Sequence, residues 1–296
     1  MIWVKSSQMP ESSEVRTIVD VISKELEGKE LTSIEVGESS KYSEGLDRYD
    51  TLIKPYLPLK IDRITCKGKQ IFFRFIRSSE GSEYVIYLNS TLGMEGKWLW
   101  EKGNHSDLWL NIVDRSIQYK KIRIRVNGRK VYFDDSRHFG NLTIRTEEEY
   151  QIKLGQIGPD LLAENVTIDE WLRKARNGRI KNKQICSFLM EQKYFSGIGV
   201  YLKSEILYKS KIRPNIILND LSDSELETIL LNSLEIIRSS YRLGGLTVRS
   251  YWDPNGKKGS FQCLVYNKKF DPYGNPVITS TFKDNRTTHW VPSVQM

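Results

Sequence analysis

The sequence predicts an α+β protein with an N-terminal antiparallel β-sandwich and a C-terminal helical domain that ends in a β-hairpin. Short runs of β-branched and aromatic residues fill positions 30–150 and are separated by Gly, Asn and Asp, a pattern typical of antiparallel strands. Apolar residues then recur at helical spacing in four segments between residues 167 and 242. Strand-like sequence returns after residue 260, which favours a terminal hairpin.

The N-terminal domain is expected to span residues 1–150. An amphipathic helix over 12–27 places Val15, Ile18, Ile22 and Leu26 on one face, with a serine as its N-cap. Alternating apolar and polar residues then predict strands in 64–76, 83–92, 107–113, 121–135 and 140–146. This order favours a sandwich or barrel with one flanking helix.

The C-terminal half is expected to contain a linker at 151–165, a helical domain at 166–250 and a hairpin region at 251–296. Helix candidates cover 167–177, 180–192, 199–210 and 222–242, and the last has the strongest periodicity. The turn signal DPYGN (271–275) separates two strand candidates, 261–270 and 276–282.

Charge and composition limit the classes of partner and compartment. The 296-residue chain carries a formal charge of +8, which favours a polyanion, nucleic acid ahead of a membrane surface. It contains no apolar run long enough for a membrane span and no signal-peptide pattern. Cys66, Cys186 and Cys263 are too scattered for a disulfide framework and indicate a reducing compartment. We expect an intracellular monomer, nuclear or cytoplasmic depending on its source.

The stretch QKYFSGIGVYLKSEILYKSKIRP (192–214) carries the most specific local signal. A helix is expected to end near Gln192, and the turn SGIG, with Gly197 and Gly199, leads into the next helix. Backbone amides at such a helix start can bind a phosphate. Cations that could contribute are Lys181, Lys183, Lys203 and Lys209. The alternative is a helix–helix corner that needs glycine only for close packing.

Several segments, in the same order along the chain, resemble the formamidopyrimidine-DNA glycosylase and endonuclease VIII (Fpg/Nei) family of DNA glycosylases. The SGIG stretch resembles the helix–two-turn–helix of that family. MPESSEV (9–15) resembles its MPE-x-x-E-V start, and the C-terminal region resembles its finger. The other matching segments are GKQIFF (68–73), TLGMEGKW (91–98), DDSRHFGNL (134–142) and IGPDLL (157–162).

The resemblance implies three catalytic residues. A proline at the N-terminus has a free amine that can attack a sugar carbon and form an iminium, which is an electron sink for elimination. The resemblance implies that Pro10 is this nucleophile, that Glu11 shuttles protons at the deoxyribose, and that Lys69 assists base release. With MIWVKSSQ retained, the Pro10 nitrogen is an amide and is inert, so we expect the active chain to begin at Pro10.

The resemblance also implies a set of DNA-binding residues. Met94, Arg137 and Phe139 match the residues that fill the gap left by an extruded base, since unbranched and aromatic side chains fit between base pairs. Arg286 matches a hairpin arginine that contacts a phosphate beside the lesion. The alternatives are core packing for Met94 and Phe139, and an exposed bystander for Arg286.

The sequence departs from the family pattern at two places within these motifs. Many relatives hold the finger with four cysteines around zinc, but the matching positions here include Tyr273, Val291 and Val294. We therefore expect no structural zinc, and a zincless finger held by apolar packing. Val200 stands where the family has the Asn of GIGN. Because valine cannot donate a hydrogen bond, phosphate binding would fall to backbone amides, Lys203 or Arg286.

These observations predict a bifunctional DNA glycosylase and AP lyase of base excision repair, which excises oxidised bases, pyrimidines favoured, and cleaves the strand by β/δ-elimination. Damaged DNA, duplex or single-stranded, is the expected partner, with no cofactor. Two alternatives stay open. One is a non-catalytic relative that binds damaged DNA, and the other is an RNA-binding helix–two-turn–helix protein, which would have no need of MPE-x-x-E-V or Lys69.

Overall fold

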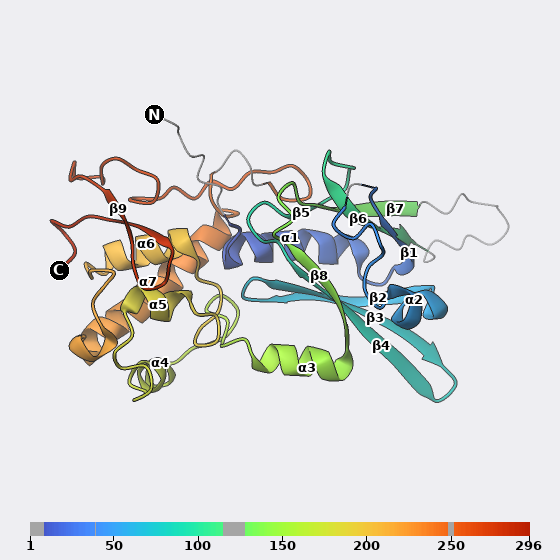
Figure 1. Ribbon diagram of the computed structural model, residues 1–296, viewed down its shortest axis with the longest axis horizontal. Coiled ribbons are helices and arrows are strands. Elements are labelled where there is room, and N and C mark those ends of the chain that lie inside the picture. The colour runs from blue at the N-terminus through green and yellow to red at the C-terminus, as the bar shows by residue number, and fades with distance from the viewer. Residues whose placement is uncertain (1–8, 39, 115–127, 248–251) are drawn as a thin grey trace. The chain divides into compact units, whose positions relative to one another are not determined.

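The computed structural model describes residues 9–38, 40–114, 128–247 and 252–296 (Figure 1). The chain forms two compact units. The first is built mainly from Val15–Leu154, together with a short segment that ends at Lys258, and the second from Gly155–Thr247 and Gly259–Met296. Residues Glu11–Glu14 are grouped with the second unit. Each unit therefore contains residues from more than one part of the chain, whereas the sequence predicted domains that follow one another without interruption.

The described residues of the first unit form one antiparallel sheet of eight strands in the order β5-β7-β6-β1-β2-β3-β4-β8. Figure 1 shows β2, β3 and β4 as long neighbouring strands. The strand bounds are β1 Glu30–Val36, β2 Leu59–Lys67, β3 Gln70–Ser79, β4 Ser82–Thr91, β5 Lys97–Leu99, β6 Ser106–Val113, β7 Gly128–Asp134 and β8 Asn141–Thr146.

This sheet makes the predicted sandwich by bending at the pairing of β1 with β2, which has only two residue pairs in register. Side chains from both halves of the sheet belong to one buried cluster. The ring of Phe73 in β3 lies 5.0 Å from that of Trp98 in β5, although these strands are far apart in the sheet order. The two halves therefore pack face to face, as alternating apolar residues predict.

Four helical segments accompany the sheet: α1 Ser12–Leu26, α2 Tyr49–Leu52, the 3-10 turn η1 Lys54–Tyr56 and α3 Glu147–Gly155. The apolar face predicted for the first helix is confirmed, because Val15, Ile18, Ile22 and Leu26 are fully buried in the sheet's core. By contrast, α3 begins in residues assigned to the N-terminal domain and continues into the predicted linker. Its Tyr150 stacks on Tyr87 of β4 with ring centroids 3.9 Å apart. Residues 151–155 of the predicted linker continue the same helix.

The second unit contains the four predicted helices, α4 Ile168–Ala175, α5 Ile185–Met190, α6 Val200–Lys209 and α7 Asp223–Arg242, with the 3-10 turn η2 Leu218–Asp220. The first turn of α7 has a capping box, in which Ser222 and Glu225 satisfy each other's backbone amides. Helix α5 is shorter than expected, because residues 180–183 form a turn and a bend and Gln184 forms an isolated bridge with Ile217. Helices α6 and α7 lie side by side (Figure 1).

The terminal hairpin is present, but it lies later in the chain than the strand candidates predicted. Its strands are β9 Ile278–Thr281 and β10 Thr287–Trp290. The DPYGN segment instead forms a compact turn, in which the Asp271 carboxylate accepts the backbone N–H groups of Tyr273 and Asn275. Only an isolated bridge, Phe270 to Pro276, forms across it. Within the described residues, no helix combines the length and apolar character required to cross a bilayer.

Candidate active site and nucleic-acid interface

Four predicted site residues of the first unit lie at one end of three neighbouring strands. Gln70, the first residue of β3, pairs with Thr91, the last residue of β4, and Thr91 pairs with Asn141, the first residue of β8. The β2–β3 turn with Lys69, the loop after β4 with Met94, and the segment before β8 with Arg137 and Phe139 therefore leave the sheet at the same edge. Sequence separation alone did not show this.

The Met94 loop and the Arg137–Phe139 turn contact each other directly. Gly93 adopts a positive φ of 58°, and a Cβ atom there would lie 2.4 Å from the carbonyl carbon of Phe139, so only glycine permits this approach. The Ser136 hydroxyl donates to the Glu95 carboxylate at 2.6 Å. The two segments thus form one continuous structure, which we call the wedge.

Arg137 and Phe139, two of the side chains that the resemblance implied, are exposed in the wedge. The ring of Phe139 is 56% exposed, which rules out core packing for this residue. The Arg137 guanidinium lies 4.9 Å from the centroid of that ring, a cation–π contact. Met94 is half-buried. An exposed aromatic ring beside a cation is suited to contact with unstacked bases and phosphates.

Buried Asp135 holds this turn in place. Its side chain is fully buried and accepts the backbone N–H groups of Gly140 at 2.5 Å and of Arg137 at 3.3 Å. The turn bearing the wedge side chains is therefore built on a carboxylate that sequence reasoning did not single out. The sequence does contain a signal for this turn, because an Asp side chain often accepts the backbone N–H of the residue two positions further along the chain.

In the second unit, the Glu11 side chain occupies the start of α6. Its carboxylate accepts backbone N–H groups of Gly199 at 2.6 Å, Tyr201 at 2.8 Å and Leu202 at 3.3 Å. The first amides of a helix lack partners within the helix and carry the positive end of its dipole, so they favour an anion. Here the anion is a carboxylate of the same chain, which is 1% exposed.

This geometry corrects the predicted phosphate cradle at Gly197 and Gly199. The Gly199 amide is bound to Glu11, and the Gly197 amide donates to the Gln192 side chain at 2.9 Å. These two donors are therefore already used within the protein. The SGIG turn serves close packing, the alternative left open from the sequence, because a Cβ atom on Gly199 would lie 2.3 Å from the carboxyl carbon of Glu11.

Glu14 fixes the backbone around residue 11. Its buried carboxylate accepts the N–H of Glu11 and the N–H of Leu246, each at 2.9 Å, and the hydroxyl of Tyr201 at 3.1 Å. Burial raises the pKa of Glu14, although the amide hydrogen bonds oppose that shift. Two carboxylates of MPESSEV thus bind this segment to the helical unit, which accounts for both glutamates of the motif.

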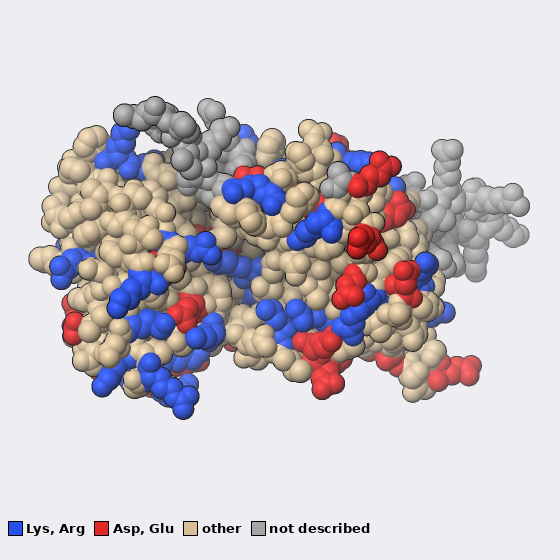
Figure 2. Space-filling view, viewed as in Figure 1, with Lys and Arg blue, Asp and Glu red and all other residues tan. Residues whose placement is uncertain are grey.

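The predicted cations of the second unit differ in accessibility. Lys181 is exposed, and Figure 2 shows that Lys and Arg predominate over Asp and Glu on the visible face of this unit. Arg286 is also exposed, in the turn between β9 and β10. The prediction for Lys203 is wrong in this respect, because its side chain is fully buried and ion-paired with Asp284. Its ammonium is therefore not a surface cation for phosphate.

Apolar packing surrounds two of the three finger positions at which the sequence departs from the cysteine pattern. Val291 is fully buried against Tyr208 and Val265, and Val294 packs at the edge of the same cluster. Tyr273, the third position named from the sequence, is 86% exposed and lies outside it. Among the residues that the structure describes, no group of three or more His, Cys, Asp or Glu side chains is placed to hold a metal ion.

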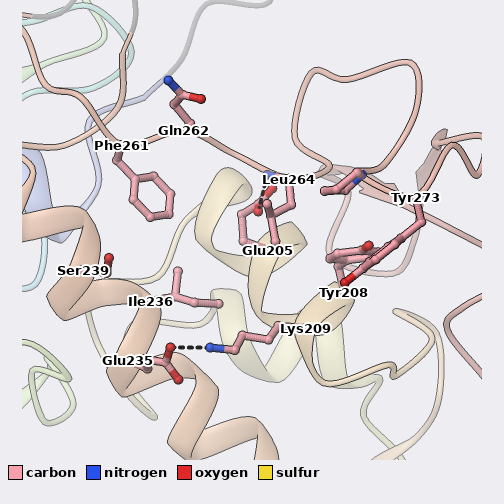
Figure 3. Close-up of a pocket in the computed structure, with 11 residues that line it drawn as sticks. Glu205, Tyr208, Lys209, Glu235, Ile236, Ser239, Phe261, Gln262, Leu264 and Tyr273 are labelled. Atoms are coloured by element: carbon pink, nitrogen blue, oxygen red, sulfur yellow. Dashed lines mark hydrogen bonds and ion pairs between the residues drawn. The ribbon is translucent and has the colours of Figure 1, made fainter.

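A pocket of about 450 Å³ opens beside α6 and α7 (Figure 3). Glu205 at its wall accepts three backbone N–H groups, from Leu264, Val265 and Tyr266. Lys209 and Glu235 form an ion pair of 2.5 Å across the helices. None of the predicted catalytic residues lines this pocket, and of the predicted cations only Lys209 does.

Comparison with known proteins covers nearly the whole chain. The N-terminal domain model of formamidopyrimidine-DNA glycosylase matches residues 9–142, the H2TH domain model of the same protein matches 157–251, and its C-terminal domain model matches 250–296. Formamidopyrimidine-DNA glycosylase of Mycoplasma mobile is 30% identical over 270 residues, covering 89% of each chain. The enzyme of that name from Legionella pneumophila (strain Lens) is 29% identical over 277 residues, covering 88% of each.

Two solved structures show that the fold is that of Fpg (MutM) proteins. A Lactococcus lactis Fpg mutant in complex with a Fapy-dG containing DNA superposes with a TM-score of 0.79 at 23% identity, covering 97% of this chain and all of that one. The MutM protein of Thermus thermophilus superposes with a TM-score of 0.78 at 24% identity, covering 97% and 98%. The chain belongs to the formamidopyrimidine-DNA glycosylase family, whose members are DNA glycosylases of DNA repair.

Proposed function

We propose that this glycosylase excises oxidised bases from damaged DNA and then cleaves the strand as an AP lyase, in base excision repair. The observation that carries this proposal is the gathering of Lys69 and the wedge at one edge of the sheet, set by the pairing of Gln70, Thr91 and Asn141. A group that assists base departure and the side chains that replace an extruded base have to act on the same nucleotide. Lys69 and the wedge leave the sheet at the same edge, so they are suited to act on one nucleotide.

The nucleophile in this proposal is the amine of Pro10 in a chain that begins there. The family model matches from residue 9, and the ordinary pKa of an α-amino group, near 8, leaves a useful neutral fraction at pH 7. The nitrogen lone pair attacks C1′, and the bond from C1′ to the base breaks with the electron pair leaving on the base. Lys69 supplies a proton to that base.

The Pro10 nitrogen then loses its proton and forms a double bond with C1′, while the C1′–O4′ bond breaks and O4′ takes up a proton. The resulting iminium draws electrons toward nitrogen, so a proton leaves C2′ and the 3′ phosphate departs with the electron pair of its bond to C3′ in β-elimination. A second elimination expels the 5′ phosphate, and water then releases the sugar fragment from Pro10. Glu11 lies next to the amine in sequence and its carboxylate is held by three backbone amides. We propose that Glu11 passes the proton lost by the amine to the ring oxygen as the sugar opens, and that it fixes the position of residue 10.

For substrate choice we propose that oxidised pyrimidines are favoured over 8-oxoguanine. The finger without cysteine ligands supports this preference, whereas the names of the relatives refer to formamidopyrimidines, and the Lactococcus complex contains Fapy-dG. Excision rates on matched oligonucleotides with thymine glycol, Fapy-dG or 8-oxoguanine decide between these lesions. Fastest release of 8-oxoguanine would overturn the preference while leaving the glycosylase activity intact.

Borohydride trapping tests the proposed chemistry. The chain that begins at Pro10 is expected to give a covalent adduct with abasic-site DNA, because borohydride reduces the iminium to a stable amine. The chain that begins at Met1 serves as the control, since its Pro10 nitrogen is an amide. Equal adduct with both chains would exclude the N-terminal amine as the nucleophile.

A non-catalytic protein that binds damaged DNA is the second candidate. Val200 at the start of α6 favours it, because this position cannot supply the side-chain donor that the family sequence has there. The same trapping experiment separates the two candidates, since such a protein would bind abasic-site DNA and yield no adduct from either chain.

A further inference from the structure

Lys203 has an unusual environment for a lysine. It lies in the first turn of α6, and its side chain is 0% exposed, whereas lysine is almost never fully buried unless it is paired. Its partner is the carboxylate of Asp284, whose side chain is 2% exposed. The ammonium donates to Asp284 Oδ2. A fully desolvated ion pair therefore connects α6 with the turn between β9 and β10.

The second oxygen of the same carboxylate reaches the backbone of Arg286. Asp284 Oδ1 accepts the Arg286 N–H at 3.2 Å, two residues along the turn. One side chain thus binds the Lys203 ammonium with one oxygen and the Arg286 main chain with the other. The position from which the exposed Arg286 side chain extends depends on this carboxylate.

Two further hydrogen bonds hold the hairpin against α5 and α6. The Lys283 N–H donates to Gln184 Oε1 at 3.1 Å, and the His289 N–H donates to the Ser204 hydroxyl at 3.2 Å. Strands β9 and β10 share only four residue pairs, and a hairpin of that size is marginally stable by itself in water. Contacts with α5 and α6 therefore set its orientation.

We propose that the buried Lys203–Asp284 pair positions Arg286 for a DNA phosphate. This inference rests on the proposed DNA-binding function. A buried ion pair often adds little net stability compared with apolar residues of similar size. It does require a specific geometry, so its effect here is to fix the orientation of the turn that carries Arg286. Lys203 and Asp284 are positioning residues, and of these three residues only Arg286 contacts the DNA.

A double-mutant cycle tests the proposal with the chain that begins at Pro10 and duplex DNA carrying a tetrahydrofuran abasic-site analogue. Arg286→Ala in the native chain is expected to weaken binding roughly 10- to 100-fold, the effect of one charge-assisted hydrogen bond. In a Lys203→Met, Asp284→Ala background, which removes both the ion pair and the acceptor of the Arg286 N–H, the same substitution is expected to cost less than about threefold, because Arg286 is no longer held toward the phosphate. An equal penalty in both backgrounds would overturn the proposal.

Lys209→Met provides a matched control. It applies the same substitution on the same helix and removes the Lys209–Glu235 pair, which is half-exposed and joins α6 to α7. The Arg286→Ala penalty is expected to stay at its native size in this background. A penalty reduced there as well would show that any loss of charge from α6 has the effect, and would overturn the specific role of Lys203.

Salt dependence gives a readout that a structural role alone would not change. Replacing both Lys203 and Asp284 leaves the net charge of the chain unaltered. Loss of the Arg286 contact is nevertheless expected to lower the slope of log K against log salt concentration by about 0.9, the value for one phosphate. An unchanged slope in the double variant would contradict the proposal.

If the double variant does not fold, Asp284→Glu carries the same test. This change keeps the charge pair and lengthens the side chain by one methylene, which displaces either Lys203 or the Arg286 N–H. The Arg286→Ala penalty is again expected to shrink, and a native penalty would overturn the proposal. If Arg286→Ala has no effect in the native chain while borohydride trapping persists, the positioning role fails and the glycosylase–lyase function stands.

Discussion

Glu11 Oε2 accepts the backbone N–H of Gly199 at 2.6 Å, across 188 positions of sequence. The residue that follows Pro10 is thereby bound to the first turn of α6. Because Glu14 also binds the Glu11 amide, the main chain at residues 10 and 11 has little freedom. An amine that attacks a sugar carbon benefits from such positioning, since an ordered nucleophile reacts faster than a mobile one.

Gly199→Ala is expected to displace Glu11. The added Cβ atom would lie 2.3 Å from the Glu11 carboxyl carbon, far inside van der Waals contact. We expect a lower midpoint of thermal unfolding and a borohydride-trapping rate reduced by roughly tenfold or more. Gly178→Ala is the control, because a Cβ atom there meets nothing within 4 Å. Native trapping by Gly199→Ala would show that the Glu11 contact is dispensable.

Much of the helical unit could be predicted from the sequence, because its signals are local. Apolar spacing and the Ser222–Glu225 capping box mark α7 without reference to any other part of the chain. The hairpin was predicted too early in the chain because DPYGN is a strong turn signal. In the structure, the Asp271 carboxylate closes an isolated turn within this segment. Turn chemistry identifies a reversal of the chain but not which strands pair across it.

The polar interior of the site could not be predicted in the same way. Lys203 and Gly199 suggest a phosphate site when read locally, because a lysine and a glycine at a helix start are the usual elements of one. The partners that change this interpretation, Asp284 and Glu11, lie 81 and 188 positions away. Only the tertiary structure shows that the anions at this helix belong to the protein itself.

Phe139→Ala is expected to slow base excision from duplex DNA by about tenfold while leaving excision from single-stranded DNA nearly unchanged. Unstacking a base from a duplex costs a few kcal/mol, which the wedge offsets, and a single strand has no stack to replace. Excision rates on the two substrates measure the difference. Phe270→Ala is the control, since Phe270 is 58% exposed against 56% for Phe139. Equal slowing on both substrates would contradict a wedge function.

Lys69→Ala is expected to separate base release from strand cleavage. Loss of a positioned acid–base group slows the release of an oxidised base by roughly 10²–10⁴-fold. Nicking of a pre-formed abasic site involves no base departure and is expected to change far less. Single-turnover rates on both substrates provide the comparison. Equal loss of the two activities would assign Lys69 to DNA positioning instead.

His289 is expected to make stability depend on pH. Burial, followed by the charge of Lys203, lowers the pKa of His289, and its Nδ1 has no hydrogen-bond partner in the described part of the chain. Below the ordinary histidine pKa of about 6.5, the unfolded chain therefore binds more protons than the folded one, so this contribution to stability is present above that pH and is lost as pH falls. Urea unfolding at about pH 7.5 and about pH 5.5 measures it. His289→Phe is expected to lose less stability on acidification, and an equal loss would exclude His289 as the cause.

The most direct test of the account is to locate the bond between protein and DNA. The chain that begins at Pro10 is trapped on abasic-site DNA with borohydride, digested with trypsin and analysed by mass spectrometry. The account predicts that the sugar remnant is attached to the first residue of the peptide PESSEVR, residues 10–16. Attachment to Lys69 or to any other lysine, with residues 10–16 unmodified, would contradict it.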